Sequence, residues 1–152
     1  DPSNYLGFVE AHIEQGPVLN EMNLPLGVVT SINGSVRYVG EIIGMASHAG
    51  TTPMDRRRDA ATAGAELVLY MEKRGSEDPN LVATVGMLEV PSGSINVIPG
   101  RCKFSLDIRA TTDAVREAAE SARDNAYMQM AAGVDADRAL AQHLALAPAM
   151  LV

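Results

Sequence analysis

Cys102-Lys103-Phe104-Ser105-Leu106-Asp107-Ile108-Arg109 alternates between apolar and polar residues along its whole length. Because successive side chains of a strand point to opposite faces, this run predicts a half-buried strand with its apolar side in the core. Asp107 and Arg109 then lie together on the outer face. A surface ion pair of little energetic value is the simplest interpretation of Arg109 at this stage.

Other runs around this strand also have the composition of strands. They are rich in β-branched and apolar residues, and they cover 26–32, 35–44 and 81–90. Asn33-Gly34, between the first two runs, is a hairpin signal. A shorter apolar run, 6–13, predicts a short buried strand near the N-terminus.

Two segments place apolar residues at helical spacing. The first has Asp55 as its predicted cap and Gly75 as its predicted end. The second opens at Thr112 or Asp113 and ends at Gly133. The apolar stripes are Ala60, Ala63, Gly64, Leu67, Val68 and Met71 in the first helix, and Val115, Ala118, Ala119, Ala122, Ala126 and Met130 in the second. The small residues of the first stripe predict close packing on a sheet.

The order from residue 26 is strand, strand, helix, strand, strand, helix. This order predicts an α+β domain, in which an antiparallel four-stranded sheet carries both helices on one face. Arg37 and Arg109 then share the opposite face. An exposed sheet edge, or the helices, would pair across a two-fold axis to give a homodimer.

A loop with a single histidine joins the second strand to the first helix. It reads Gly44-Met45-Ala46-Ser47-His48-Ala49-Gly50-Thr51-Thr52-Pro53. Its glycines and proline predict an exposed loop held by regular elements, which is a good setting for chemistry. A merely solvated turn histidine explains the spacing equally well. The neighbouring basic run Arg56-Arg57-Arg58 is interpreted as a solvated helix start, and Asn96 as a cap of the Pro99-Gly100 turn.

Polar side chains also crowd the end of the 6–13 run, in His12-Ile13-Glu14-Gln15-Gly16-Pro17. Such groups at a strand end can converge on a pocket. A lone histidine does not make a metal site, since zinc takes three or four protein ligands. Residues 18–24 predict a short helix that ends before Pro25.

Composition limits the classes of function. The chain has 152 residues, and only 4% are aromatic, so its core must be aliphatic and methionine-rich. A formal net charge of -7 argues against nucleic acid as a partner.

The single cysteine, Cys102, is typical of a reducing, cytoplasmic setting. No apolar run has the length of a membrane span, so no membrane partner is expected. The first residue is not Met, which suggests a piece of a longer chain.

Four segments together resemble one family. They are His-Ile-Glu-Gln-Gly-Pro at 12–17, Ser-His-Ala-Gly-Thr-Thr-Pro-Met with Arg-Arg-Asp-Ala within 47–60, Asn-Val-Ile-Pro-Gly at 96–100, and Leu-Asp-Ile-Arg at 106–109. In this order they resemble the carbamoylase branch of the dinuclear-zinc amidohydrolase and exopeptidase superfamily. That branch includes N-carbamoyl-L-amino acid hydrolases, β-ureidopropionases and allantoate amidohydrolases. The resemblance extends over roughly residues 5 to 125.

The resemblance implies a division of the chain and a role for each motif. Residues 1–25 would be a fragment of the metal-binding catalytic domain, 26–133 the lid and dimerisation domain, and 134–152 a tail of uncertain structure. The parent enzyme would hold two zinc or manganese ions, with His12 as one ligand. His48 and Asn96 would contact the substrate or its oxyanion. Gln15, Arg37 and Arg109 would contact the substrate, with Arg109 pairing with its carboxylate.

The chain also departs from the family pattern. The further metal ligands and the catalytic glutamate have no counterpart here, and His143 lies in a tail unlike the family's continuation. The metal site would therefore be incomplete and the chain alone inactive. The alternatives are a non-catalytic dimerisation module, and a related N-acyl amino acid hydrolase or metallo-exopeptidase.

Overall fold

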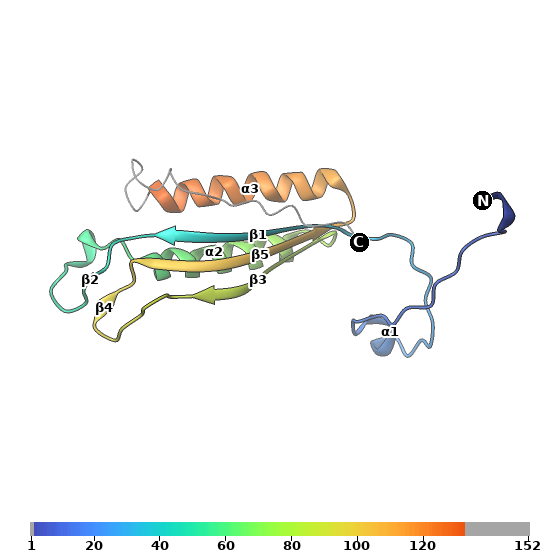
Figure 1. The fold of residues 1–152 in the computed structure, drawn as a ribbon, viewed down its shortest axis with the longest axis horizontal. Coiled ribbons are helices and arrows are strands. Elements are labelled where there is room, and N and C mark those ends of the chain that lie inside the picture. The colour runs from blue at the N-terminus through green and yellow to red at the C-terminus, as the bar shows by residue number, and fades with distance from the viewer. Residues whose placement is uncertain (1, 133–152) are drawn as a thin grey trace. The chain divides into compact units, whose positions relative to one another are not determined.

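The computed structural model describes residues 2–132 and has the predicted α+β class (Figure 1). Contacts along the backbone divide the chain into two units, residues 1–31 and the residues from 32 onward. The second unit contains the sheets and the long helices. The domain limits predicted at residues 25 and 133 stay a prediction, and the predicted 134–152 tail lies outside the described residues.

The main sheet has three antiparallel strands in the order β1-β5-β3. They are β1 (Gly34–Ile43), β5 (Arg101–Ala110) and β3 (Leu81–Glu89). The alternation that predicted the central strand is confirmed, because Cys102, Leu106 and Ile108 of β5 are buried and Arg109 is exposed. Figure 1 shows β5 lying between its two neighbours.

The strands β2 (Ser47–His48) and β4 (Val97–Ile98) pair with each other and form a separate two-stranded ribbon. The four-stranded sheet predicted from sequence is therefore replaced by three strands and this ribbon. The strand expected over 26–32 and the hairpin at Asn33-Gly34 are wrong. Within the described chain residues 26–32 have no strand partner, and side chains such as Val28 are 90% exposed. Strand propensity alone does not make a strand when no partner is available to pair with it.

Both long helices pack on one face of the sheet, as predicted. They are α2 (Ala60–Glu77) and α3 (Asp113–Ala132). The core joins Leu67 and Met71 of α2 and Ala119 of α3 to the apolar side of the sheet. Ala118 was predicted on the same stripe as Ala119 but is exposed. The side chains predicted farther along α3, at 126 and 130, lie outside those described.

The start of α2 differs from the prediction in a way that matters for the site. Met54–Arg56 forms a short 3-10 turn, η2, and Arg57 after it is extended. The helix therefore begins only at Ala60. Asp59, and not Asp55, caps it by accepting hydrogen bonds from the backbone N–H groups of Ala61 and Thr62. Gly75 does not stop the helix, which continues to Glu77.

The predicted close packing of α2 on the sheet is confirmed at Gly64. A Cβ atom there would lie 2.7 Å from Cys102 Sγ, so only glycine permits this approach. Burial and the nearby charge of Asp59 raise the pKa of the Cys102 thiol. A buried thiol of this kind fills space and is a poor nucleophile.

The N-terminal unit contains only η1 (Pro2–Asn4) and α1 (Val18–Glu21) as regular elements among its described residues. The short helix predicted within 18–24 is confirmed. The strand predicted over 6–13 is wrong, because this segment pairs with no strand in the described chain and its apolar side chains are exposed, as Leu6 and Phe8 show. An apolar run needs a partner to be buried, and residues 2–132 provide none for this one.

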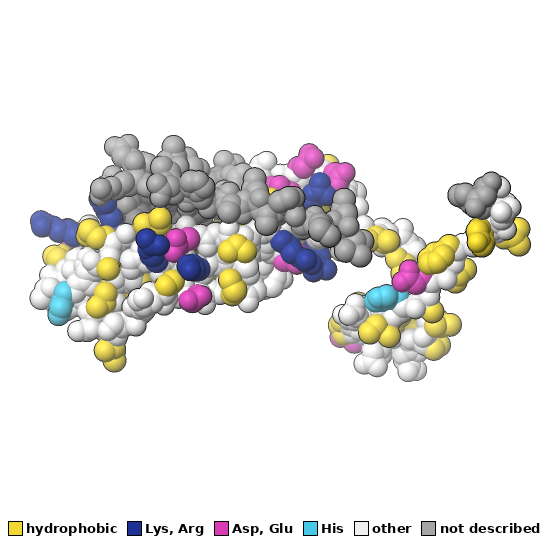
Figure 2. All heavy atoms as spheres, in the orientation of Figure 1, with side chains coloured by type: hydrophobic (Ala, Val, Ile, Leu, Met, Phe, Trp, Pro, Cys, Tyr) yellow, Lys and Arg dark blue, Asp and Glu magenta, His cyan; other side chains and the backbone are white. Residues whose placement is uncertain are grey.

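The surface carries mixed charge. Figure 2 shows basic and acidic side chains interspersed on the visible face of the second unit, without one continuous basic patch. Among the described residues, none of the helices combines the length and apolar composition that a membrane crossing requires. The cytoplasmic setting suggested by the lone cysteine stays a prediction.

Candidate functional site

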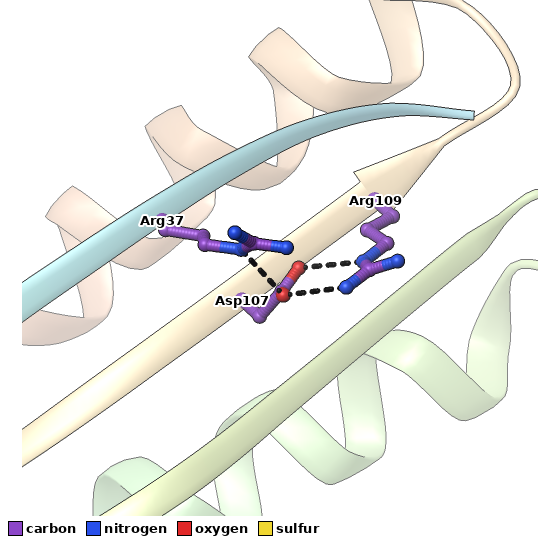
Figure 3. Close-up of polar contacts among 3 residues, drawn as sticks. All are labelled: Arg37, Asp107 and Arg109. Carbon is purple, nitrogen blue, oxygen red and sulfur yellow. Dashed lines mark hydrogen bonds and ion pairs between the residues drawn. The ribbon is translucent and has the colours of Figure 1, made fainter. Parts of the chain in front are cut away.

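The outer face of the sheet brings two predicted substrate-binding arginines together on one carboxylate (Figure 3). Arg37 and Asp107 are direct partners in the β1–β5 register. Asp107 accepts hydrogen bonds from Arg109 Nε and Nη2, both at 2.9 Å, and from Arg37 Nε at 3.0 Å. The ion pair between Asp107 and Arg109 was the simplest sequence interpretation, and it forms. The addition of Arg37 turns this pair into a cluster with a net charge of plus one.

The charges of this cluster stabilise one another. The hydrogen bond from Arg109, helped by that from Arg37, holds the pKa of the Asp107 carboxyl below its usual range, although partial burial opposes the shift. The same bond raises the pKa of Arg109. Asp107 therefore stays ionised at neutral pH and holds both guanidinium groups in place.

A shallow groove of about 530 Å³ runs over this cluster. Its lining includes Arg37, Asp107 and Arg109, together with Val82, Thr84 and Gly86 of β3. Arg109 Nη1 and the terminal nitrogens of Arg37 make no hydrogen bond within the described residues. The groove therefore offers guanidinium N–H donors to an anion beside an uncharged wall.

His48 lies in the β2–β4 ribbon with its ring held in one orientation. The backbone N–H of Gly50 donates to His48 Nδ1 at 3.0 Å. A neutral imidazole that accepts at Nδ1 must carry its proton on Nε2. The exposed edge of the His48 ring is therefore a hydrogen-bond donor.

Asn96 adjoins the same ribbon. Its backbone carbonyl accepts from the N–H of Ala49 at 3.0 Å, and its side-chain Oδ1 accepts from Ser94 Oγ at 2.9 Å. The hydrogen bond from Ser94 orients the amide, whose exposed Nδ2 group carries two N–H donors. The sequence interpretation of Asn96 as a cap of Pro99-Gly100 is replaced by this pairing with the histidine loop.

The ribbon and the arginine cluster lie at opposite ends of the sheet. Arg37 is near the start of β1, whereas β2 follows the end of β1 at Ile43 (Figure 1). At about 3.3 Å per residue, the span from Arg37 to Ile43 is roughly 20 Å. Within one chain, His48 and Arg109 therefore do not meet around one small molecule.

His12 and Gln15 belong to the N-terminal unit and are exposed. The ring Nδ1 of His12 bonds to the carbonyl oxygen of Ile13 at 2.5 Å, so in the neutral ring Nε2 keeps its lone pair. This is the tautomer that a metal-ligating histidine commonly uses, with its other nitrogen bonded to a carbonyl. Gln15 has a positive φ of 55°.

The described residues do not fit a metal pair by themselves. Within residues 2–132, no three His, Cys, Asp or Glu side chains form a group that could hold a metal ion. His12 has the chemistry of one ligand and lacks companions there. His143 lies outside the described residues.

Arg57 contacts the turn that follows His48, and the sequence interpretation missed this role. It was grouped with its neighbours as part of a solvated helix start, yet it is half-buried and donates to the carbonyl oxygens of Ala49 and Thr52. Arg56 is exposed, as expected. The only available signal was the motif that carries Arg57 beside Asp59, because periodicity cannot tell which of three adjacent arginines turns inward.

Several known proteins are similar to this chain. Residues 30–131 match the family model of the peptidase dimerisation domain. N-carbamoyl-L-amino acid amidohydrolase of Geobacillus stearothermophilus is 45% identical over 116 residues, 76% of this chain and 28% of that protein. A probable allantoate deiminase of Oryza sativa subsp. japonica is 46% identical, over 76% of this chain and 27% of that protein.

Solved structures agree. The crystal structure of a hydantoinase/carbamoylase family amidase from Burkholderia multivorans superposes with a TM-score of 0.78 and 40% identity, over 81% of this chain and 30% of that one. The chain thus spans less than a third of the length of these relatives. The resemblance inferred from the four sequence segments is confirmed. The chain belongs to the peptidase dimerisation domain family, alongside the N-carbamoyl-L-amino acid amidohydrolases and allantoate deiminases.

Proposed function

We propose that this chain supplies the lid and dimerisation part of an amidohydrolase that cleaves a linear amide or ureido C–N bond. Its substrates are N-carbamoyl amino acids or allantoate, as the names of the relatives suggest. The chain contributes residues that bind and orient the substrate, while its own described residues do not complete a catalytic centre. Alone, the chain is expected to be inactive.

One observation carries this proposal: His48 and Asn96, in and beside the ribbon, are each held by a hydrogen bond to a ring or amide acceptor atom. Gly50 N–H occupies His48 Nδ1, and Ser94 Oγ occupies Asn96 Oδ1. Both side chains are exposed and present N–H donors, Nε2–H of His48 and the Nδ2–H groups of Asn96. Hydrolysis of an amide or ureido carbon passes through a tetrahedral oxyanion, which such preorganised donors stabilise.

The arginine cluster supports recognition of a carboxylate. Arg109 is held by Asp107 through two N–H groups, which leaves Nη1 and the exposed terminal edge for the substrate. An oriented guanidinium suits a carboxylate in two-point geometry. Arg37 adds a second donor from β1, and Gln15 is proposed as a further contact from the N-terminal unit.

The distance between the two groups supports a homodimer. A substrate of this size cannot touch Arg109 and His48 of one chain, which lie at opposite ends of the sheet. We propose that a second copy provides the missing group, with the free edge of β1 or the helices forming the interface. Light scattering of the concentrated chain should give a dimer mass, and a monomer would count against this arrangement.

A pair of zinc or manganese ions is proposed for the whole enzyme, with His12 as a ligand. When bound, such ions activate water for attack and polarise the carbonyl group. The remaining ligands would come from outside the described residues. The roles proposed for His48, Asn96 and Arg109 are binding and hydrogen-bond donation.

The test uses a graft enzyme: the Geobacillus stearothermophilus relative with its matching segment replaced by residues 30–131 of this chain. His48→Ala and Asn96→Ala should each lower kcat by about 10²–10³, the cost of losing one oxyanion donor. Asp55→Ala, at an exposed site near the same loop, is the matched control and should leave kcat unchanged. Unchanged kcat in both donor variants would remove the oxyanion role.

A second candidate is a non-catalytic dimerisation module, which the description of the matched family favours. A related N-acyl amino acid hydrolase or exopeptidase is a further form of the enzyme hypothesis. The graft enzyme separates them. Turnover of N-carbamoyl amino acids that falls in His48→Ala supports the first proposal. Turnover that no substitution in residues 30–131 changes supports the non-catalytic dimerisation module. A preference for acyl amino acids or dipeptides supports the N-acyl amino acid hydrolase or exopeptidase.

A further inference from the structure

Arg57 makes two hydrogen bonds to the turn that follows His48. Its Nη2 donates to the carbonyl oxygen of Ala49 at 2.7 Å, and its Nε donates to that of Thr52 at 3.1 Å. The turn is closed from its other side by the N–H of Thr52, which donates to the carbonyl oxygen of His48 at 3.2 Å. One guanidinium therefore holds both ends of the turn, and we call these two hydrogen bonds of Arg57 the clamp.

The peptide group between Ala49 and Gly50 connects this clamp to the histidine ring. Its carbonyl oxygen accepts a hydrogen bond from Arg57. Its N–H points in the opposite direction within the peptide plane and donates to His48 Nδ1 at 3.0 Å. Because a peptide group is planar, fixing its oxygen also fixes the direction of its N–H. The positive charge at the oxygen also strengthens the N–H as a donor, since linked hydrogen bonds polarise one another.

The clamp reaches Asn96 as well. The N–H of Ala49 donates to the carbonyl oxygen of Asn96 at 3.0 Å, so the residue that Arg57 holds also extends the β2–β4 pairing to Asn96. Both proposed donors therefore depend on the position of one short turn. Movement of that turn would move both of them.

The base of the clamp is anchored to the rest of the fold. The neighbouring Arg58 forms a β-bridge with Met45, and its carbonyl oxygen accepts from the N–H of that residue at 2.8 Å. Asp59 caps α2, and the N–H of Ala60 donates to the carbonyl oxygen of Pro99 at 2.9 Å. The backbone next to Arg57 is thus fixed by these contacts, whereas the turn that its side chain reaches is exposed or only half-buried.

We propose that Arg57 is the positioning residue that sets the orientation of the His48 ring through the Ala49–Gly50 peptide. The functional meaning of this role rests on the proposed oxyanion function of His48, but the role itself is a property of the chain. Its test therefore needs no enzymatic activity. A failure of Arg57 as a positioning residue is distinguishable from a failure of His48 as a donor.

The test compares Arg57→Ala, Arg57→Lys and the matched control Arg56→Ala in the intact 152-residue chain. Amide hydrogen exchange at Gly50 and Thr52 should become about tenfold faster in Arg57→Ala, because both N–H groups lose the fixed turn that protects them. Exchange in β5 should stay at the wild-type rate. The ¹⁵N resonance of His48 Nδ1 should move toward that of a ring nitrogen without a hydrogen bond, while the His12 ring stays unchanged.

Arg56→Ala should match the wild type in every one of these measurements, since its side chain is exposed. Arg57→Lys offers one ammonium in place of a fork and should lie between the wild type and Arg57→Ala. If Arg57→Ala accelerates exchange throughout β5, the fold has loosened and Arg57→Lys becomes the deciding variant. Wild-type exchange at Gly50 and an unmoved Nδ1 resonance in the deciding variant would overturn the proposal.

Discussion

Replacing Asp107 with Asn should destabilise the chain at neutral pH and have almost no effect in acid. The substitution keeps the size of the side chain but removes the charge that Arg37 and Arg109 share. Arg109 engages that charge with two N–H groups, both at 2.9 Å, which is the favourable geometry for such a pair.

The magnitude must be discounted for solvent. The side chains are 28% exposed in Asp107, 46% in Arg109 and 60% in Arg37, so water screens both ion pairs. Exposed pairs contribute up to about 1 kcal/mol each, and many contribute less. We therefore expect Asp107→Asn to lower the free energy of unfolding by about 1 kcal/mol at pH 7.

The pH dependence follows from the lowered pKa of Asp107 in the folded chain. A carboxyl with a depressed folded pKa contributes its stability above its unfolded pKa of about 3.9, and loses it as the pH falls through the folded pKa. The difference between the wild type and Asp107→Asn should therefore be largest at neutral pH and shrink in acid. Other titrating groups affect both proteins alike and cancel in the difference.

Urea unfolding at a series of pH values, from 7 down to about 3, measures this difference directly. Asp55→Asn is the matched control, because among residues 2–132 the exposed Asp55 side chain forms no hydrogen bond or ion pair. It should match the wild type throughout. Equal stability of Asp107→Asn and the wild type at pH 7, or a difference that persists unchanged in acid, would refute the account of the cluster.

Three predictions concern the fold that positions the site. Asp59→Ala removes the cap of α2 and should lower the unfolding free energy by about 1 kcal/mol, measured by urea denaturation, whereas full stability would show that the cap is dispensable. Leu67→Ala leaves a cavity at a side chain that is 1% exposed and should cost about 2–5 kcal/mol in the same assay, and a loss below 1 kcal/mol would contradict the packing. Gly64→Ala gains about 1 kcal/mol of helix propensity but places a Cβ 2.7 Å from the buried Cys102 Sγ, so its melting temperature should fall, and a rise would disprove the close approach.

The regular elements with strong periodicity were predictable. The alternation around Leu106 identified β5, and the helical spacing of Ala60, Leu67 and Met71 identified the buried face of α2. The strand predicted over 26–32 failed because strand formation needs a partner, which local composition does not provide. The cap at Asp55 failed because a 3-10 turn and an extended residue precede the helix.

The candidate site was predictable only in part. Arg37 and Arg109 were placed on one face by period-two alternation, and Asp107 was recognised as a neighbour of Arg109. The pairing of His48 with the segment of Asn96 depends on a ribbon between distant residues, and short ribbons leave no periodic signal. The inward turn of Arg57 likewise depends on a hydrogen bond to backbone carbonyls, and sequence patterns do not reveal such bonds.

The central claim is that Arg109 recognises the carboxylate of a small ureido or amide substrate. The most direct test measures kcat/KM of the graft enzyme, with and without Arg109→Ala, on an N-carbamoyl amino acid and on the same compound with its carboxylate converted to a carboxamide. A charged hydrogen bond is worth about 1.5–3 kcal/mol, so the carboxamide should be about tenfold to hundredfold worse for the enzyme that retains Arg109. That preference for the acid should disappear in Arg109→Ala. An equal preference in both enzymes would show that Arg109 does not bind the carboxylate.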